Sequence, residues 1–143
     1  MRSPPFGDRS RSASTLAQIA RDTSGCEVIV ADLLAPPTME RFDGVWAMAS
    51  LLHVQRDLIR EAMASLASML KPGGILFSSV KRGVGNAVDE TGRRFTLYDE
   101  AHWATHLRGA GFEIIEITGE PPVDGSAVGT VAPGWISSLA RLP

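Results

Sequence analysis

Apolar residues along this chain form two patterns, short continuous runs and stretches that repeat at helical spacing. The runs are of strand length and predict strands at residues 28–31, 42–49, 75–80 and 135–140. Residues 112–117 instead alternate apolar and acidic side chains, which predicts a half-buried strand near a sheet edge. Helical spacing predicts amphipathic helices at residues 14–22, 57–70 and 99–110. Strands that alternate with helices favour an α/β fold in which helices cover both faces of a mostly parallel sheet.

Glycine and proline mark the boundaries of these elements. Pro72-Gly73-Gly74 follows the helix at 57–70 and stops it, because proline cannot continue a helix and glycine accepts a positive φ. Residues 81–94 are glycine-rich and charged, which predicts an exposed loop or hairpin. The strands at 112–117 and 135–140 are joined by a long loop with Pro121-Pro122 and no helix, so we expect the last strand to pair antiparallel.

The composition is that of an ordinary globular domain: 143 residues, 44% of them hydrophobic and 21% charged, with a net charge of −2. This balance gives no electrostatic reason for nucleic-acid binding, and no apolar run reaches the roughly 18 residues that predict a membrane span. The single cysteine, Cys26, cannot form an internal disulfide, which favours the cytoplasm. Residues 1–13 are polar and predict a disordered tail rather than a secretory signal.

Two segments at a fixed separation carry a resemblance to a known family. Residues 42–54 read FDGVWAMASLLHV, and residues 70–76, after the predicted helix, read LKPGGIL. This combination resembles the part of class I S-adenosylmethionine-dependent methyltransferases that runs from the fourth strand to the fifth. Residues 94–96, 110–113 and 135–140 resemble the segments around the family's last helix and its sixth and seventh strands. The resemblance covers residues 14–142 and implies a Rossmann-like three-layer sandwich with an antiparallel last strand.

The N-terminal part of the family's pattern is missing. No glycine-rich turn precedes Ser14, and Arg11 stands near the position of the acidic residue that binds the cofactor ribose in the family. The resemblance therefore implies an incomplete fold, a tail at 1–13 followed by a partial methyltransferase-like domain at 14–143. Because the family's first strand lies mid-sheet, its absence exposes the edge of the strand at 42–49. We expect a homodimer that covers this edge, or poor solubility.

The resemblance implies S-adenosylmethionine as the cofactor, with its site beyond the ends of the strands. Asp32 follows the strand at 28–31 and matches the acidic residue that accepts the adenine amino group, and Leu33 matches the residue whose backbone amide contacts the ring. Ala47 and Met48 match residues that line the methionine part. The other interpretation of Asp32 is an ordinary loop or helix-cap carboxylate.

Polar residues near the same edge of the sheet are candidates for contact with a small-molecule methyl acceptor. His53 follows the strand at 42–49, where the family meets its substrate, and is a candidate general base; the alternative is a packed or solvent-facing loop histidine. Four cationic residues could hold an anionic substrate or form a solvated rim: Lys81, Arg82, Arg93 and Arg94.

These residues leave two hypotheses for the function. The first is a truncated S-adenosylmethionine-dependent methyltransferase that acts on an unidentified small molecule, and the second is a non-catalytic remnant that serves as a binding or dimerisation module. The missing glycine-rich turn favours the second, whereas Asp32, His53 and the pattern of strand ends favour the first. We predict no metal centre, since His102 and His106 lie four apart on a helix without a third ligand.

Overall fold

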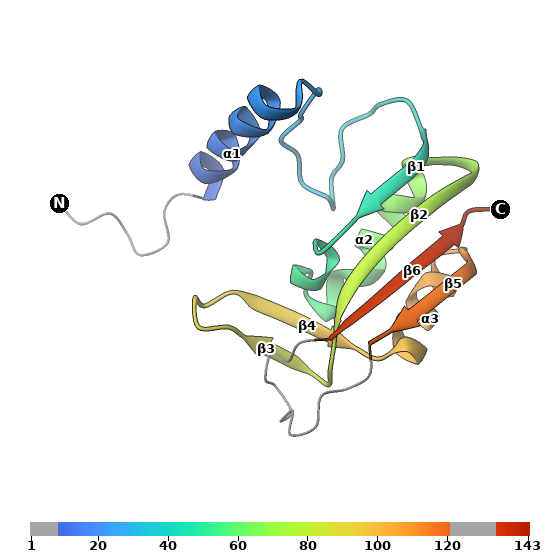
Figure 1. Cartoon of the computed structure of the whole chain (residues 1–143). Coiled ribbons are helices and arrows are strands. Elements are labelled where there is room, and N and C mark those ends of the chain that lie inside the picture. The colour runs from blue at the N-terminus through green and yellow to red at the C-terminus, as the bar shows by residue number, and fades with distance from the viewer. Residues whose placement is uncertain (1–8, 121–133) are drawn as a thin grey trace. The chain divides into compact units, whose positions relative to one another are not determined.

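The computed structural model describes residues 9–120 and 134–143, and its contacts divide the chain into two compact units, Met1–Pro37 and Thr38–Pro143 (Figure 1). The first unit contains the helix α1 (Arg9–Ser24), and the second contains a sheet with the other helices. The predicted loop around Pro121-Pro122 lies outside the described residues.

The helix α1 spans 16 residues and is longer than predicted. It begins at Arg9 and so includes residues 9–13, which the sequence predicts as part of a tail; residues 1–8 lie outside the described part of the chain. Arginine, serine and alanine tolerate a helix, which extends readily once its first turn has formed. The helix ends at Ser24, and the next residue, Gly25, has a φ of 68° and an amide that donates to the Arg21 carbonyl at 2.9 Å, as in a left-handed C-terminal cap.

The strand predicted at residues 28–31 does not form. Residues 25–31 lie in neither helix nor strand, and Ile29 and Val30 are each 53% exposed. A strand needs backbone hydrogen bonds to a neighbour, and none of the strands in the described residues pairs with this segment. Instead, Arg21 holds the Val28 carbonyl through Nε at 3.1 Å and Nη2 at 2.6 Å. The β-branched run therefore has strand propensity without a partner strand.

The second unit is built on a sheet of six strands: β1 (Phe42–Ala47), β2 (Leu70–Arg82), β3 (Asn86–Val88), β4 (Arg94–Tyr98), β5 (Glu113–Gly119) and β6 (Trp135–Arg141). Strand β2 is central, with β1 and β4 parallel to it along one edge and β6 antiparallel along the other. Strands β5 and β3 pair antiparallel with β6 and β4. Hence β1, β2, β4 and β5 run in one direction, and the predicted mostly parallel sheet with an antiparallel last strand is confirmed.

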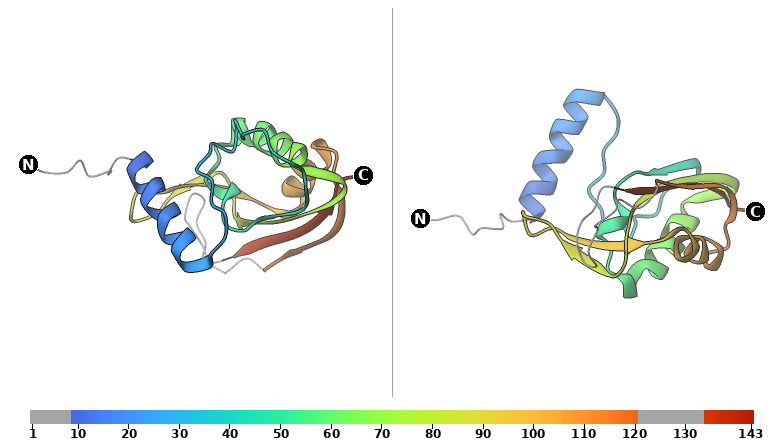
Figure 2. Two further views of the ribbon diagram at one scale, coloured as in Figure 1. Left: turned by 90° about the horizontal axis from the view of Figure 1, so that it is seen from above. Right: turned by 60° about the horizontal axis from the view of Figure 1, so that its bottom comes forward.

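Two helices, α2 (Ile59–Ser68) and α3 (Glu100–Gly109), lie on the same face of this sheet (Figure 2). On that face the side chains of Leu76 and Val80 are fully buried. Trp103 of α3 is also fully buried, and its Nε1 donates to the hydroxyls of Ser78 at 3.2 Å and Ser138 at 3.3 Å. This one side chain therefore fastens α3 to both β2 and β6.

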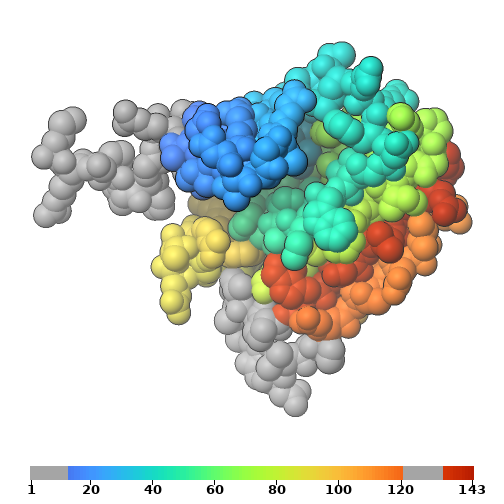
Figure 3. All heavy atoms as spheres, turned by 45° about the horizontal axis from the view of Figure 1, so that its top comes forward, coloured from blue at the N-terminus to red at the C-terminus, as the bar shows by residue number. Residues whose placement is uncertain are grey.

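The opposite face of the sheet has no helix on it within residues 38–120 and 134–143. Figure 3 shows atoms of β1, β2, β6 and β5 at the surface on this side. Trp46 is 70% exposed and stacks on Phe77 of the neighbouring strand, with ring centroids 3.9 Å apart. This unit thus has two of the three predicted layers, which makes the fold an incomplete α/β sandwich.

Strand β2 begins earlier than predicted, and the helix before it is shorter. A 3₁₀ turn (Arg56–Leu58) precedes α2, and β2 starts at Leu70 rather than at residue 75. The Gly73 amide donates to the Leu142 carbonyl at 2.6 Å, and the Leu142 amide donates to the Gly74 carbonyl at 2.9 Å. Pairing with the distant C-terminal residues, which no local pattern reveals, extends the strand through the Pro-Gly-Gly segment.

Residues 81–94, predicted as a loop or hairpin, contain β3 and lead into β4, and the two strands form a hairpin. Sequence reasoning did not predict β4, although its apolar positions alternate. Phe95 and Leu97 of β4 pack with Leu52 and Ala87 in a small buried cluster. This cluster fixes the hairpin against the 3₁₀ turn Leu51–His53, which follows β1.

Candidate active site

The chain turns sharply where β1 ends. Ala49 has a φ of 52°, a left-handed conformation that is uncommon for a residue other than glycine, and its amide donates to the Ser79 hydroxyl at 2.9 Å. Before this turn, Ala47 is only 7% exposed, whereas Met48 is 63% exposed. The two residues matched to the methionine side of a cofactor site therefore differ: the Ala47 side chain is buried in the unit, and only Met48 is open to a ligand.

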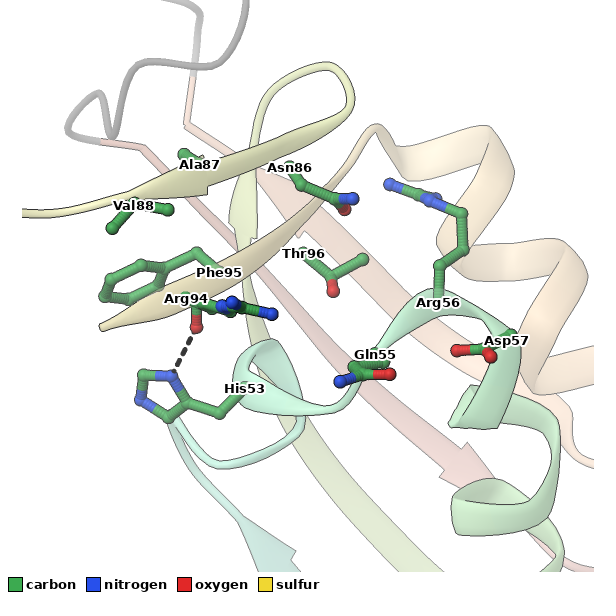
Figure 4. Close-up of a pocket in the computed structure, with 10 residues that line it drawn as sticks. All are labelled: His53, Gln55, Arg56, Asp57, Asn86, Ala87, Val88, Arg94, Phe95 and Thr96. Atoms are coloured by element: carbon green, nitrogen blue, oxygen red, sulfur yellow. Dashed lines mark hydrogen bonds between the residues drawn. The ribbon is translucent and has the colours of Figure 1, made fainter. Parts of the chain in front are cut away.

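His53 ends the 3₁₀ turn after β1, and the hairpin fixes its ring. Nδ1 lies 2.9 Å from the carbonyl oxygen of Arg94, and the ring packs at a tilt on Phe95 with centroids 4.9 Å apart (Figure 4). A carbonyl oxygen only accepts hydrogen bonds, so Nδ1 is the donor. In the neutral ring, Nε2 therefore carries the lone pair. His53 is exposed and has the tautomer that a general base requires at Nε2.

A pocket of about 810 Å³ opens beside His53, between the 3₁₀ turns and the hairpin. Its lining residues come from these two segments: His53, Gln55, Arg56, Asp57, Asn86, Ala87, Val88, Arg94, Phe95 and Thr96 (Figure 4). A volume in this range suits a small organic molecule. The lining combines an apolar wall with amide, hydroxyl and charged groups.

Arg56 holds one wall of this pocket in place. Its Nη2 donates to the carbonyls of Leu97 at 2.8 Å and Gly85 at 3.1 Å, and its guanidinium lies 5.0 Å from the centre of the Tyr98 ring. A second bond, from the Thr96 hydroxyl to the Val54 carbonyl at 2.7 Å, joins the same two segments. The walls are therefore tied together by hydrogen bonds within the chain.

Three of the four cationic residues that we considered for an anionic substrate have other partners. Arg82 forms an ion pair with Glu100, and its hydrogen bond is the main cause of the lowered pKa of the Glu100 carboxyl. The Lys81 ammonium lies 4.2 Å from the centre of the Trp135 ring. Arg93 pairs with Asp89 at 2.8 Å and also lies near the Phe95 ring. Sequence reasoning could not separate these residues from Arg94, because the distinction depends on tertiary contacts.

Arg94 differs from the other three because it lines the pocket. Within residues 9–120 and 134–143, its guanidinium takes part in no ion pair. Its main chain and side chain have separate roles, since the carbonyl already accepts the hydrogen bond from His53.

Asp32 and Leu33 belong to the first unit, whereas Ala47, Met48 and His53 belong to the second. Asp32 is exposed and sits in a turn in which its Oδ1 accepts from the Leu34 amide at 2.9 Å. The structure brings Met48 and His53 to the same end of β1, within the second unit.

The histidine pair on α3 has structural contacts. His102 Nδ1 lies 2.8 Å from Oδ2 of Asp99, and its amide donates to the other oxygen of that carboxyl, so Asp99 caps the helix. The hydrogen bond from the His102 backbone amide is the main cause of the lowered pKa of the Asp99 carboxyl. His106 packs edge-on against Tyr98. No cluster of three or more potential metal ligands occurs in the part of the chain that the structure describes.

Sequence reasoning missed much of the pocket wall. It did not single out Arg56, Asn86 or Thr96, which contact the site from segments far apart along the chain. The one available signal was the alternation in residues 94–98, which predicts a strand close to His53 only once its partner is known.

Comparisons with known proteins identify the family and the fold. A sequence model of the methyltransferase domain family matches residues 7–78, just over half of the 143 residues. The chain therefore belongs to that family, whose class I S-adenosylmethionine-dependent members it resembles. No curated protein matches it in sequence. Among the described helices, none is both long and apolar enough to cross a membrane.

Solved structures show the same fold at low sequence identity. The 1,6-didemethyltoxoflavin-N1-methyltransferase of Burkholderia thailandensis, crystallised with 1,6-didemethyltoxoflavin and S-adenosylhomocysteine, is 20% identical with a TM-score of 0.67. The match covers 90% of this chain and 55% of that protein. The N-methyltransferase NodS of Bradyrhizobium japonicum, in complex with S-adenosylhomocysteine, is 20% identical with a TM-score of 0.62, over 93% of this chain and 62% of that protein.

A methyltransferase of Methanosarcina mazei gives a TM-score of 0.70 at 13% identity, over 90% of this chain and 77% of that protein. The chain thus spans little more than half the length of the Burkholderia and Bradyrhizobium enzymes.

Proposed function

We propose that this chain is the acceptor-binding part of an S-adenosylmethionine-dependent methyltransferase and that it methylates a small molecule in the pocket beside His53. The observation that carries the proposal is the fixed tautomer of His53, whose Nε2 is available as a base at the end of β1 in a fold shared with methyltransferases. The single cysteine, Cys26, is exposed and free, which supports a reducing compartment such as the cytoplasm.

The residues present fit part of a cofactor site. Asp32 and Leu33 would hold the adenine, and Met48, with the buried Ala47 before it, would line the methionine part; the exposed Asp32 carboxylate and the sharp turn at Ala49 support this assignment. When bound, S-adenosylmethionine would supply a methyl group on a positively charged sulfur; a nucleophile bonds to the methyl carbon, and the electron pair of the broken carbon–sulfur bond stays on the sulfur. No strand precedes α1 in the described residues, so these residues do not supply the glycine-rich turn.

His53 performs the proton transfer in this proposal. An acceptor hydroxyl or amine forms its new bond to the methyl carbon with a lone pair and loses a proton, which Nε2 of His53 accepts. The imidazolium that forms keeps its Nδ1 bond to the Arg94 carbonyl, so the ring does not have to move. The hydrogen-bonded walls of the pocket position the acceptor, and holding two reactants in the right geometry by itself lowers the barrier of a reaction.

The cofactor assignment is tested by NMR titration with S-adenosylhomocysteine, which detects weak binding. We expect the signals of Leu33 and of the Met48 methyl group to shift, and the shifts to disappear in Asp32→Ala. A hydrogen bond to a charged group contributes about 1.5–3 kcal/mol, so this variant should bind at least about tenfold more weakly. Asp22→Ala, on the exposed side of α1, is the control; no shift at millimolar ligand in the unmodified chain contradicts the assignment.

A second candidate function, a dimerisation module, is favoured by the surface around β1. Within the described residues β1 pairs with β2 alone, and Phe42 and Trp46 on this strand are 46% and 70% exposed. Unpaired strand edges beside exposed aromatic side chains are templates for pairing with another chain. Analytical ultracentrifugation should show a dimer that Trp46→Glu dissociates and that Ile115→Glu, a matched change on the outer strand β5, leaves intact. A monomer at all concentrations contradicts this candidate.

A further inference from the structure

We propose that the methyl acceptor carries a carboxylate and that the guanidinium of Arg94 binds it. This inference rests on the proposed function for its biological meaning, but it concerns a binding site that exists without the cofactor. It narrows the acceptor from any small molecule to a small organic acid with a hydroxyl or amine as its nucleophile.

The cationic group available in the pocket is the Arg94 side chain. Arg56 also lines the pocket, but two backbone carbonyls accept from its Nη2 and its guanidinium packs on the Tyr98 ring. Arg94 is exposed and has no ion-pair partner among the residues that the structure describes. A guanidinium matches a planar carboxylate with two parallel hydrogen bonds, so it is the natural ligand for that group.

The charge balance of the pocket favours a single negative charge. Its lining contains two positive groups, Arg56 and Arg94, and one negative group, Asp57, which leaves a net charge of +1 when His53 is neutral. A monoanion neutralises this charge. A phosphate carries close to two negative charges at neutral pH and would leave an excess beside Asp57.

Arg94 also links the recognition of the anion to the position of the base. Its carbonyl holds His53 Nδ1 at 2.9 Å, while its side chain lines the same pocket as the His53 ring (Figure 4). An acceptor bound to this guanidinium is therefore placed by the same residue that orients the base. The rest of the wall, with Phe95, Ala87 and Val88, suits the apolar body of a small organic acid.

The test measures binding of 4-hydroxybenzoate, a probe that combines a monoanion with a hydroxyl nucleophile on one ring, in the absence of any cofactor. The readout is the Cε1–H signal of His53, one of three histidines in the chain, which His53→Gln assigns. We expect saturable shifts of this signal, with at least tenfold weaker binding in Arg94→Gln. Arg93→Gln, the matched neighbour that pairs with Asp89 instead, should change the affinity less than twofold.

Two further probes distinguish the chemistry of the ligand. The methyl ester of 4-hydroxybenzoate has the same ring without the charge and should bind at least tenfold more weakly, and inorganic phosphate should bind more weakly than 4-hydroxybenzoate. Equal binding of the ester, tighter binding of phosphate, equal effects of Arg94→Gln and Arg93→Gln, or no binding of 4-hydroxybenzoate would each overturn the proposal. Nitrogen NMR should show the same Nδ1–H signal of His53 in Arg94→Gln as in the unmodified chain, because the backbone carbonyl of residue 94 that accepts this bond is unchanged. An unchanged signal shows that the variant keeps the local fold.

The outcome is separable from that of the proposed function. If S-adenosylhomocysteine does not bind, the cofactor assignment fails while carboxylate binding at Arg94 is unaffected. If the probes do not discriminate, the carboxylate proposal fails while cofactor binding through Asp32 remains as it was.

Discussion

His53 shows how much of this site depends on a single backbone group. The ring and the Arg94 carbonyl that orients it are separated by 41 positions in sequence, and the hairpin brings them to 2.9 Å. The hydrogen bond selects one of two tautomers of a neutral imidazole, and this decides which nitrogen can take a proton. In the proposed function, this hydrogen bond gives a residue type that is common on loops a defined chemical role.

Asp89 plays a comparable part in the hairpin that carries Arg94. Its Oδ1 accepts from the Thr91 hydroxyl at 2.7 Å and from the amides of Thr91 and Arg93 at 2.9 Å, while Oδ2 pairs with the Arg93 side chain. These bonds, the Thr91 hydroxyl first, lower the pKa of Asp89 from 3.8 to about 2. The charged form is therefore the one that stabilises the turn.

A pH dependence follows from Asp89. Because its pKa is lower in the folded state, its contribution is fully present above about pH 3.8 and is lost as the pH falls through about 2. We expect Asp89→Asn to have a lower Tm than the unmodified chain at pH 7, and the difference to shrink between pH 4 and pH 2. Thermal unfolding over this pH range measures it, with Glu90→Gln as the neighbouring control; a Tm difference that does not change with pH contradicts the role of the charge.

At the scale of elements, the reversal from α2 into β2 sets the geometry of the central strand. The hydrogen bonds of Gly73 and Gly74 to Leu142 hold this reversal against the C-terminal end of β6. Gly74 is closely surrounded: a Cβ atom there would lie 2.8 Å from the Lys71 carbonyl oxygen and 3.2 Å from that of Asp43. The glycine is therefore required by backbone atoms that cannot move independently of the sheet.

Substitution of Gly74 should destabilise the whole sheet. We expect Gly74→Ala to lower the free energy of unfolding by about 1–3 kcal/mol, the usual cost of forcing an extra methyl group into a packed region. Gly109→Ala is the matched control, because a Cβ at this helical position meets nothing within 4 Å. Urea unfolding of the two variants should separate them clearly, and equal midpoints for Gly74→Ala and the unmodified chain would refute the requirement.

At the scale of the whole molecule, the chain consists of two units, and the residues matched to the cofactor are divided between them. The second unit has helices on one face of its sheet, while aromatic side chains lie exposed on the other face and along β1. All residues that line the pocket beside His53 belong to the second unit. In the proposed function, acceptor recognition therefore depends on one compact unit, whereas the residues assigned to the cofactor come from both units.

The lack of a glycine-rich turn in the described residues predicts weak binding of the cofactor. The described residues supply an exposed carboxylate and a strand end but no glycine-rich turn before a helix, and such a turn provides the backbone amides that hold a dinucleotide-like ligand. We expect isothermal titration calorimetry with S-adenosylhomocysteine to give a Kd well above the micromolar range. Low-micromolar affinity would show that another segment of the chain replaces the turn.

The sequence by itself determined most of the elements of the second unit and the antiparallel direction of the last strand. Apolar runs and helical periodicity located α2, α3, β1, β5 and β6 to within a few residues, because burial of one face imposes these periods. The motif pair around residues 42–54 and 70–76 identified the family correctly. The position of His53 after β1 was by itself enough to make it a candidate general base.

Tertiary structure decided the remaining features, each for a physical reason. The run at 28–31 has strand propensity but pairs with none of the described strands, so it lacks the ladder of backbone hydrogen bonds that a strand needs. The start of β2 at Leu70 depends on hydrogen bonds to the C-terminal residues. Arg93 differs from its neighbour Arg94 because Asp89 forms an ion pair with Arg93. Local sequence patterns indicate propensity and burial. Which group pairs with a strand edge, accepts a hydrogen bond or neutralises a charge is decided only when distant segments of the chain come together.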